Sequence, residues 1–367
     1  MAGTPPAAGR PAPEPARSST FPLSAGDRVV VTGAGGFIGS ALTRVLADRG
    51  ATVVAVLQPG ADSRNIDGLA VERAEADMRD AVAVRKVIDG ARYVFHAAAV
   101  YRFWSKEPSE FYDVNVGGTL NVLDAGAETG CERLVYTSTV GTIGLDRAAE
   151  GSPADETDWP RIEHLFGCYK RSKYVAEHEV LRAAAGGLPV VLVQPTLPVG
   201  PRDLVPTPTG RVVLDFLNGR MPGYFATSLN VVDVDDVAAG HVLALEHGGQ
   251  GRSYILGGEN RTFKQILDML AAETGLPAPR FRVPAAVAIG AAFLSEVIEG
   301  RLAGRSPSVP LEATRMATTQ MIFADERARR ELGYSSRPAA EALARSARWF
   351  AHHGYVTSER LSRIHWR

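Results

Sequence analysis

A glycine-rich turn after the first apolar run constrains this chain more than any other feature. Residues 29–32 are apolar or β-branched and lead into Gly33, with Gly36 and Gly39 at the start of a helical pattern. These glycines permit a tight turn, a close backbone approach to a ligand and close packing of helix on strand. The unpaired N–H groups of Phe37 and Ile38 at the helix start would attract phosphate. The sequence therefore predicts a strand–turn–helix unit that binds a dinucleotide.

Short β-branched runs alternate with longer amphipathic stretches along the first half of the chain. Strands are predicted at 28–31, 52–57, 92–95, 133–136 and 189–193, and helices at 41–48, 81–88, 110–128 and 169–185. Apolar strands separated by helices indicate a parallel sheet covered on both faces. We therefore predict an α/β fold of the Rossmann type, a doubly wound parallel sheet with a smaller C-terminal α/β substrate lobe.

The pattern loosens after residue 195, where five prolines predict an irregular loop. Shorter elements follow at 211–218, 229–232, 234–246, 254–256 and 263–272. The predicted organisation is a disordered leader (1–25), a dinucleotide-binding domain (26–196), a substrate lobe with segments returning to the main sheet (197–355) and a C-terminal tail (356–367).

Composition excludes several other classes of protein. The net charge of −1 gives no reason to expect nucleic acid as a partner, and eight scattered histidines predict no metal site. The apolar run 283–298 contains a proline and a glutamate and is shorter than the roughly 20 residues of a membrane span. It is predicted to be a core helix. Two distant cysteines, Cys131 and Cys168, fit a reducing compartment, so we expect a cytoplasmic protein.

A tyrosine and a lysine stand one helical turn apart at Tyr169 and Lys173. A free phenol has a pKa of about 10, too high for acid–base work near neutrality. A nearby ammonium and the positive charge of a nicotinamide would both lower it. Ser138 and Thr139 follow a predicted strand, at the sheet edge where ligands bind, and Thr139 would hold the substrate oxygen. These residues predict proton transfer coupled to hydride transfer.

The end of the second strand bears on the choice between NAD and NADP. No carboxylate stands at Leu57 or Gln58 to accept a bond from the ribose 2′-OH, and Arg64 is near enough in sequence to pair with a 2′-phosphate. This favours NADP over NAD and leaves NAD open. Asp77 and Met78 either bracket the adenine or belong to a solvated loop.

These motifs resemble the extended short-chain dehydrogenase/reductases over residues 27–355. The resemblance rests on the glycine motif, Asp77-Met78, His96 to Ala99, Asn115 to Thr119, Tyr136 to Thr139 and Tyr169-x-x-x-Lys173. Further segments, at 101–104, 206–211 and 230–238, look like the hopanoid-associated sugar epimerases, and dihydroflavonol-4-reductase-like proteins are similar more distantly. The resemblance implies a Thr139–Tyr169–Lys173 triad, with Asn115 as a structural helper. It also implies a nicotinamide cofactor and a carboxy-terminal substrate lobe. In all, we predict cofactor contacts at Gly33, Gly36, Phe37, Ile38, Gly39, Gln58, Arg64, Asp77, Met78, Ala97, Ala98, Tyr169, Lys173 and Pro195.

The same triad supports ketone reduction or sugar epimerisation. Aromatic Tyr101 and Trp104, with Ser138, would contact an apolar or ring-bearing substrate and favour reduction. Arg202 and Arg211 would instead clamp the diphosphate of a nucleotide sugar and favour an NAD-dependent epimerase.

Three further predictions concern function and assembly. A non-catalytic NADP-binding regulator is a third alternative. Dehydration is disfavoured because Val140-Gly141 follows Thr139, where sugar dehydratases of this superfamily carry an Asp-Glu pair. The helices at 110–128 and 169–185 are the candidates for a homodimer contact.

Overall fold

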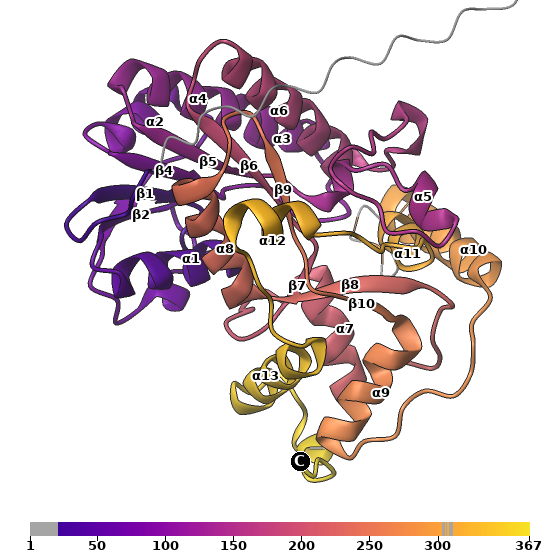
Figure 1. The fold of residues 1–367 in the computed structure, drawn as a ribbon. Helices are drawn as coiled ribbons and strands as arrows, with labels where there is room; N and C mark the ends of the chain where they lie inside the picture. The colour runs from indigo at the N-terminus through magenta and orange to yellow at the C-terminus, as the bar shows by residue number, and fades with distance from the viewer. Residues whose placement is uncertain (1–20, 303–304, 306, 308–310) are drawn as a thin grey trace, which may run out of the picture.

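The computed structural model describes residues 21–302, 305, 307 and 311–367. Its main feature is a seven-stranded sheet in the order β3-β2-β1-β4-β5-β6-β9, in which every neighbouring pair is parallel (Figure 1). The reversal of strand order beside β1 is that of a doubly wound sheet. The predicted fold class is confirmed. The strands of the main sheet are β1 (Arg28–Thr32), β2 (Thr52–Leu57), β3 (Glu72–Glu75), β4 (Tyr93–His96), β5 (Arg133–Thr137), β6 (Val190–Pro195) and β9 (Ser253–Leu256).

Helices cover both faces of this sheet, which explains why its central strands are almost wholly apolar. Along the described chain the α-helices are α1 (Phe37–Asp48), α2 (Ala81–Ile88), α3 (Ser109–Tyr112), α4 (Gly118–Thr129), α5 (Asp146–Ala149), α6 (Cys168–Ala185), α7 (Pro208–Leu217), α8 (Val234–His247), α9 (Phe263–Thr274), α10 (Ala285–Ser295), α11 (Leu311–Ala317), α12 (Glu326–Leu332), α13 (Ala339–His352) and α14 (Ser358–Leu361). Short helical turns are η1 (Arg64–Ile66), η2 (Asp113–Gly117), η3 (Val140–Thr142), η4 (Ile162–His164) and η5 (Glu296–Leu302).

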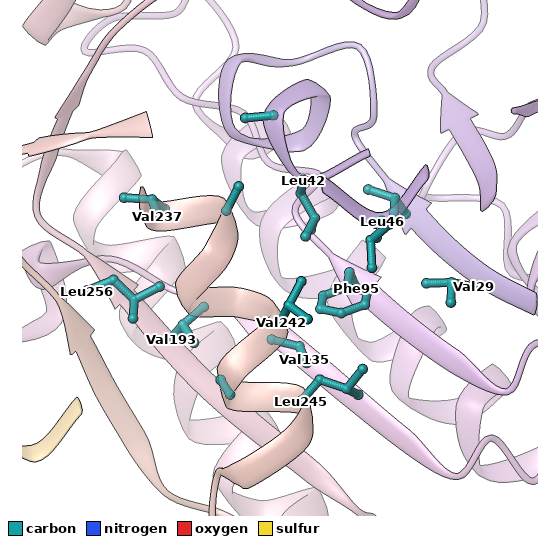
Figure 2. Close-up of a cluster of buried hydrophobic side chains, with 14 of the residues drawn as sticks. Val29, Leu42, Leu46, Phe95, Val135, Val193, Val237, Val242, Leu245 and Leu256 are labelled. Atoms are coloured by element: carbon teal, nitrogen blue, oxygen red, sulfur yellow. The ribbon is translucent and has the colours of Figure 1, made fainter. Parts of the chain in front are cut away.

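The two faces carry separate apolar cores. On one face α1 and α8 pack against each other and the sheet, and Figure 2 shows Leu42 and Val242 among strand residues such as Phe95. On the other face α2, α4 and α6 pack side by side, and they bury residues such as Val122 and Val180. The sheet is thereby shielded from water on both sides, and its ligand edge lies where the strands end.

A second, three-stranded sheet lies beyond the first, in the order β10-β8-β7, with strands β7 (Leu197–Val199), β8 (Ser228–Asp233) and β10 (Glu259–Thr262). A third apolar core joins it to α7, α9 and α13. The chain returns to the main sheet at β9, which pairs with β6. The domain boundary at residue 197 stays a prediction.

The proline-rich stretch was predicted to be irregular, and this is wrong in part. Pro195 ends β6, Pro198 lies in β7, and Pro208 is the first residue of α7. β7 is an edge strand, where a missing N–H is tolerated, and the first turn of a helix has no use for that N–H.

Two other predicted segments have different bounds in the structure. Residues 1–20 of the predicted leader lie outside the described residues, but residues 21–25 belong to the folded part. Phe21 and Leu23 pack against the core, and the Tyr93 hydroxyl donates to the Pro22 carbonyl at 3.2 Å. The predicted helix 110–128 is divided by the π-helical turn η2.

The run 283–298 was predicted to be a core helix, and this is also wrong. Most of it forms α10, which buries Ala292 and leaves Val287, Phe293 and Leu294 exposed. Among the described residues, no helix combines the length and the apolarity that crossing a membrane requires.

Candidate active site

The glycine corner between β1 and α1 leaves no room for side chains. Gly33 has a φ of 69°, and a Cβ there would lie 2.8 Å from the backbone of Ala98. A Cβ on Gly39 would collide with the Gly33 carbonyl. α1 starts directly after Gly36, without a side-chain cap and without an acidic residue in its first turn. The N–H groups of this turn are therefore available to a pyrophosphate, and the contact itself stays a prediction.

The neighbouring strand ends supply the walls of this corner. Leu57, at the end of β2, is buried, and a Cβ on Gly35 would lie 2.9 Å from its Cδ2 atom. Gln58 follows it and is exposed. Ala97 and Ala98 continue from β4, where the Ala98 N–H donates to Thr32 Oγ1 at 3.2 Å.

Arg64, the predicted partner of a 2′-phosphate, is already engaged. Its Nε donates to Asp62 Oδ2 at 2.9 Å, and this ion pair lowers the pKa of Asp62 to about 2. A 2′-phosphate would have to compete with that carboxylate. Arg64 therefore supports the prediction of NADP less strongly than its position in the sequence indicated. The expected preference for NADP over NAD now rests on the absence of an acidic residue at Leu57.

The two residues expected near the adenine also have partners in the protein. Asp77 accepts bonds from the backbone N–H and the guanidinium of Arg79. Met78 is buried beneath Gly118, and its carbonyl accepts from Asn121 at 2.8 Å. An adenine contact from Asp77 or Met78 stays a prediction, as does a contact from Pro195 at the end of β6.

Tyr169 and Lys173 lie on the first turns of α6, and both are buried. Burial raises the pKa of Tyr169 above its usual value, and a hydrogen bond with the Thr139 side chain opposes this rise. Thr139 also caps η3 by accepting from the Gly141 N–H at 3.1 Å. The structure thus brings Thr139, which precedes η3, close to Tyr169 at the start of α6. The expected lowering of the Tyr169 pKa by Lys173 is not found in the protein alone.

Lys173 instead points toward the end of β5. Its Nζ donates to the Thr137 carbonyl at 2.7 Å and lies 4.3 Å from the centre of the Tyr136 ring. Burial lowers the pKa of Lys173 to about 7, and the charge of Glu177 partly offsets that fall. Near neutral pH this amine is therefore close to losing its proton, which is rare for a lysine.

Glu177 is a residue that the sequence reasoning missed. It is buried on α6, one turn after Lys173, and accepts hydrogen bonds from the hydroxyls of Ser138 and Thr142 and from Gln194 Nε2. Ser138 was predicted to contact the substrate, but its hydroxyl faces this carboxylate instead. The spacing of four residues from Lys173 was the available signal. A glutamate at that spacing is more often a solvated surface residue.

Two buried polar residues fasten the surrounding loops. Asn115, in the η2 turn, accepts from the Val100 N–H at 2.8 Å and donates to Ser172 Oγ at 2.9 Å. His96 contacts Thr32 through Nδ1 and Thr119 through Nε2, and burial lowers its pKa to about 3. His96 is therefore neutral and serves as a structural link, and the helper role expected of Asn115 matches its contacts.

Tyr101 and Trp104, which were both predicted to contact the substrate, have different surroundings. The Tyr101 ring lies 4.8 Å from the Tyr169 ring, centre to centre, so Tyr101 borders Tyr169. Trp104 lines a surface cavity of about 400 Å³ with Arg102 and Glu110.

The two arginines expected to clamp a diphosphate differ in whether they are available to bind an anion. Arg202 is part-buried in an ion pair with Asp235, so it is not free to bind another anion. Arg211, on α7, is exposed. Asp203 and Asp215 are close enough to interact with its charge.

Among the described residues no group of three or more His, Cys, Asp or Glu is arranged to hold a metal ion. Cys131 is buried and Cys168 half-buried, and neither forms a disulfide.

Comparison with known proteins places the chain among nicotinamide-dependent enzymes. Residues 29–257 match the model of the NAD-dependent epimerase/dehydratase family. A protein of Synechocystis sp. named as a dihydroflavonol 4-reductase is 40% identical and covers 92% of this chain and 98% of its own length. Sterol demethylase protein B of Methylococcus capsulatus is 35% identical, with 89% and 99% covered. The crystal structure of a nucleoside-diphosphate-sugar epimerase from Pseudomonas aeruginosa superposes with a TM-score of 0.74 at 26% identity, over 90% of this chain and 99% of that one.

Leu57→Asp tests the reading of the β2 end. A carboxylate there would accept from the ribose 2′-OH of NAD and repel the 2′-phosphate of NADP. We expect the ratio of NADP to NAD affinity to fall roughly tenfold or more, as the energy of a charge-assisted hydrogen bond implies. Titration calorimetry measures both affinities, with Leu57→Asn as the uncharged control. An unchanged ratio would mean that Leu57 does not face the ribose.

The chain has five lysines, so the pKa of Lys173 is directly measurable. Nuclear magnetic resonance of the isotope-labelled lysine Cε atoms should show a signal that titrates near pH 7 and disappears in Lys173→Met. Glu177→Gln removes the negative charge that favours the ammonium, so the pKa should fall further. Glu179→Gln, which changes a half-buried carboxylate paired with Arg182 on the same helix, should leave the pKa of Lys173 unchanged. A normal lysine titration in the unmodified protein would refute this description of the site.

Proposed function

Because the chain belongs to the NAD-dependent epimerase/dehydratase family, we propose that it reduces a ketone to an alcohol on a small apolar or ring-bearing substrate. The proposal rests most directly on one observation. The buried Tyr169 lies close enough to the Thr139 side chain, at the ligand edge of the sheet, for the threonine to lower its pKa, and the aromatic ring of Tyr101 lies beside it. Two hydroxyls converging in a largely apolar setting suit a carbonyl oxygen carried by an apolar group.

The glycine corner and the ends of β2 and β4 would hold the dinucleotide, which when bound in its reduced form supplies a hydride. Thr139 would donate a hydrogen bond to the substrate oxygen and orient the carbonyl. Tyr169 would give its phenolic proton to that oxygen as the carbonyl carbon accepts the hydride, so that an alcohol forms. The ammonium of Lys173 would stabilise the resulting phenolate until a proton from water restores the phenol.

Dehydration remains disfavoured, because an elimination needs a free base beside the triad. Val140 and Gly141 follow Thr139. The buried carboxylate nearby, Glu177, accepts from three donors. These three hydrogen bonds suit a positioning role for Glu177.

Epimerisation of a nucleotide sugar is the second candidate, favoured by the exposed Arg211 and by the similarity to a structure named as such an epimerase. The ion pair of Arg202 with Asp235 weighs against it, since one arm of the proposed clamp is occupied. A regulator without turnover is the third candidate, but it would not need a buried lysine next to a buried tyrosine. A homodimer through α4 and α6 also stays a proposal.

Tyr169→Phe tests the proton donor. We expect the rate of ketone-dependent NADPH oxidation to fall by roughly 10²–10⁴-fold, the usual contribution of a general acid. Cofactor affinity should change little, because the ring remains. Tyr174→Phe, on the same helix, is the matched control and should keep its activity. Retained turnover in Tyr169→Phe would remove the phenol from the mechanism.

The cofactor content of the purified protein separates reduction from epimerisation. A reductase must exchange its cofactor in every cycle, so extensive dialysis should remove it, and added NADPH should be consumed in proportion to the alcohol formed. An epimerase recovers its cofactor within each cycle and retains it. NAD that survives dialysis, together with activity on a nucleotide sugar and no net NADPH oxidation, would establish the second candidate instead.

A further inference from the structure

The surface of α10 is unusually apolar for a protein in water. Residues 283–295 contain no charged side chain. Val287, Phe293 and Leu294 are 63%, 57% and 58% exposed, and Phe281 before the helix is 78% exposed. Single exposed apolar residues are ordinary, but a continuous group of them marks a contact surface.

A second exposed apolar segment lies beside the first. Trp159, Ile162 and Phe166 are exposed around the η4 turn. The two segments are joined through α11, which packs on α10 and places the Arg315 guanidinium 4.4 Å from the centre of the Phe166 ring. In Figure 1 α10 and α11 lie at the outer edge of the molecule, beside α5. The apolar rim, as we name it, consists of Trp159, Ile162, Phe166, Phe281, Val287, Phe293, Leu294 and Ile298.

Positive charge accompanies the Phe281 end of the apolar rim, whereas Glu163 and Glu299 adjoin Ile162 and Ile298. Arg280 and Arg282 flank Phe281, and both are exposed. Most arginines on this protein have a carboxylate partner, but within the described part of the chain neither of these two forms an ion pair. The segment itself is held in place, because Tyr224 and Phe281 are joined by a backbone hydrogen bond of 2.9 Å. Two unpaired cations thus stand on a fixed backbone next to exposed aromatic and aliphatic side chains.

We propose that the apolar rim docks this protein on the surface of a bilayer that contains anionic lipids. Phe281, Val287, Phe293 and Leu294 would enter the boundary between headgroups and acyl chains, and the two arginines would meet lipid phosphates. The overall charge of −1 does not oppose this, because the interaction is local and is screened within about 10 Å. The proposal goes beyond ketone reduction and does not depend on it.

The distribution of apolar residues around α10 favours a lipid bilayer over a second copy of the chain as the partner of the apolar rim. A helix that pairs with another helix needs one apolar stripe, with polar residues on the rest of its surface. α10 is apolar on all sides, and α11 covers only part of it. A bilayer surface can accommodate the whole exposed part, whereas a single partner helix would leave apolar side chains in water.

The apolar rim also lies close to the proposed catalytic helix. Glu312 of α11 packs so closely on Gly167, which precedes α6, that a Cβ there would overlap its carboxylate. Tyr169 follows two residues later. Docking would therefore bring the bilayer near the start of α6, where a substrate drawn from lipid would arrive.

Flotation of the full chain with vesicles tests the proposal. Binding to phosphatidylcholine vesicles that contain phosphatidylglycerol should exceed binding to phosphatidylcholine alone, and should weaken at high salt. The double variant Phe293→Glu/Leu294→Glu should lose at least tenfold in affinity. Arg280→Gln/Arg282→Gln should lose roughly 30-fold on anionic vesicles and little on neutral ones. Val82→Glu/Val205→Glu alters two residues that are each 80% exposed elsewhere, and it should bind like the unmodified protein.

The other outcomes overturn the proposal. Equal loss in the control pair would show that negative charge alone, and not the apolar rim, decides binding. Absence of binding to either vesicle would exclude the bilayer. A dimer that Phe293→Glu dissociates in analytical ultracentrifugation, without vesicle binding, would show that a second copy covers the apolar rim. Each variant should unfold at the same temperature as the unmodified protein, which shows that its fold is intact.

Discussion

The burial of the Lys173 amine is the constraint around which the site is organised. An ammonium taken out of water is strongly destabilised unless polar groups compensate it. Here the compensation comes from the Thr137 carbonyl, the face of the Tyr136 ring and the charge of Glu177. The balance brings its pKa to about 7, so a small change in the local charge alters its protonation. A bound cofactor and substrate are such changes.

Glu177 connects this amine to the end of the sheet. Its carboxylate bonds Ser138 and Thr142 on either side of Thr139, and Gln194 at the end of β6. Thr139 is thereby held at a defined place relative to Tyr169. The same helix therefore carries the phenol of Tyr169, the amine of Lys173 and the carboxylate of Glu177. The glycine corner on β1 opens onto the same edge of the sheet, because parallel strands end there together.

Much of this arrangement was predictable from the sequence, and the misses have physical causes. The glycine motif and the apolar strands specify local geometry, so the sheet and its order of helices followed from them. The partner of Arg64 was two residues away and visible, but the partner of Arg202, Asp235, lies 33 residues further along the chain. Glu177 looks like any surface glutamate until the fold buries it. Such contacts depend on tertiary structure, and local patterns do not contain them.

The two segments whose burial was predicted wrongly have the same explanation. Apolar residues are buried by default, which led us to place the run 283–298 in the core. In α10, by contrast, Val287, Phe293 and Leu294 stay more than half exposed, although α11 packs on part of the helix. Conversely, Phe21 and Leu23 stand in a polar, proline-rich stretch and still reach the core. Burial is decided by the whole fold, and a run of similar residues does not determine it.

The central claim is that Tyr169 stays a neutral phenol in the free protein and becomes acidic when an oxidised nicotinamide brings its positive charge. Ultraviolet difference titration of the unmodified protein against Tyr169→Phe measures the pKa of this one phenol. We expect a pKa above the usual value without cofactor and a clear fall with the oxidised cofactor, but a smaller fall with the reduced one. An equal pKa in all three states would contradict the account.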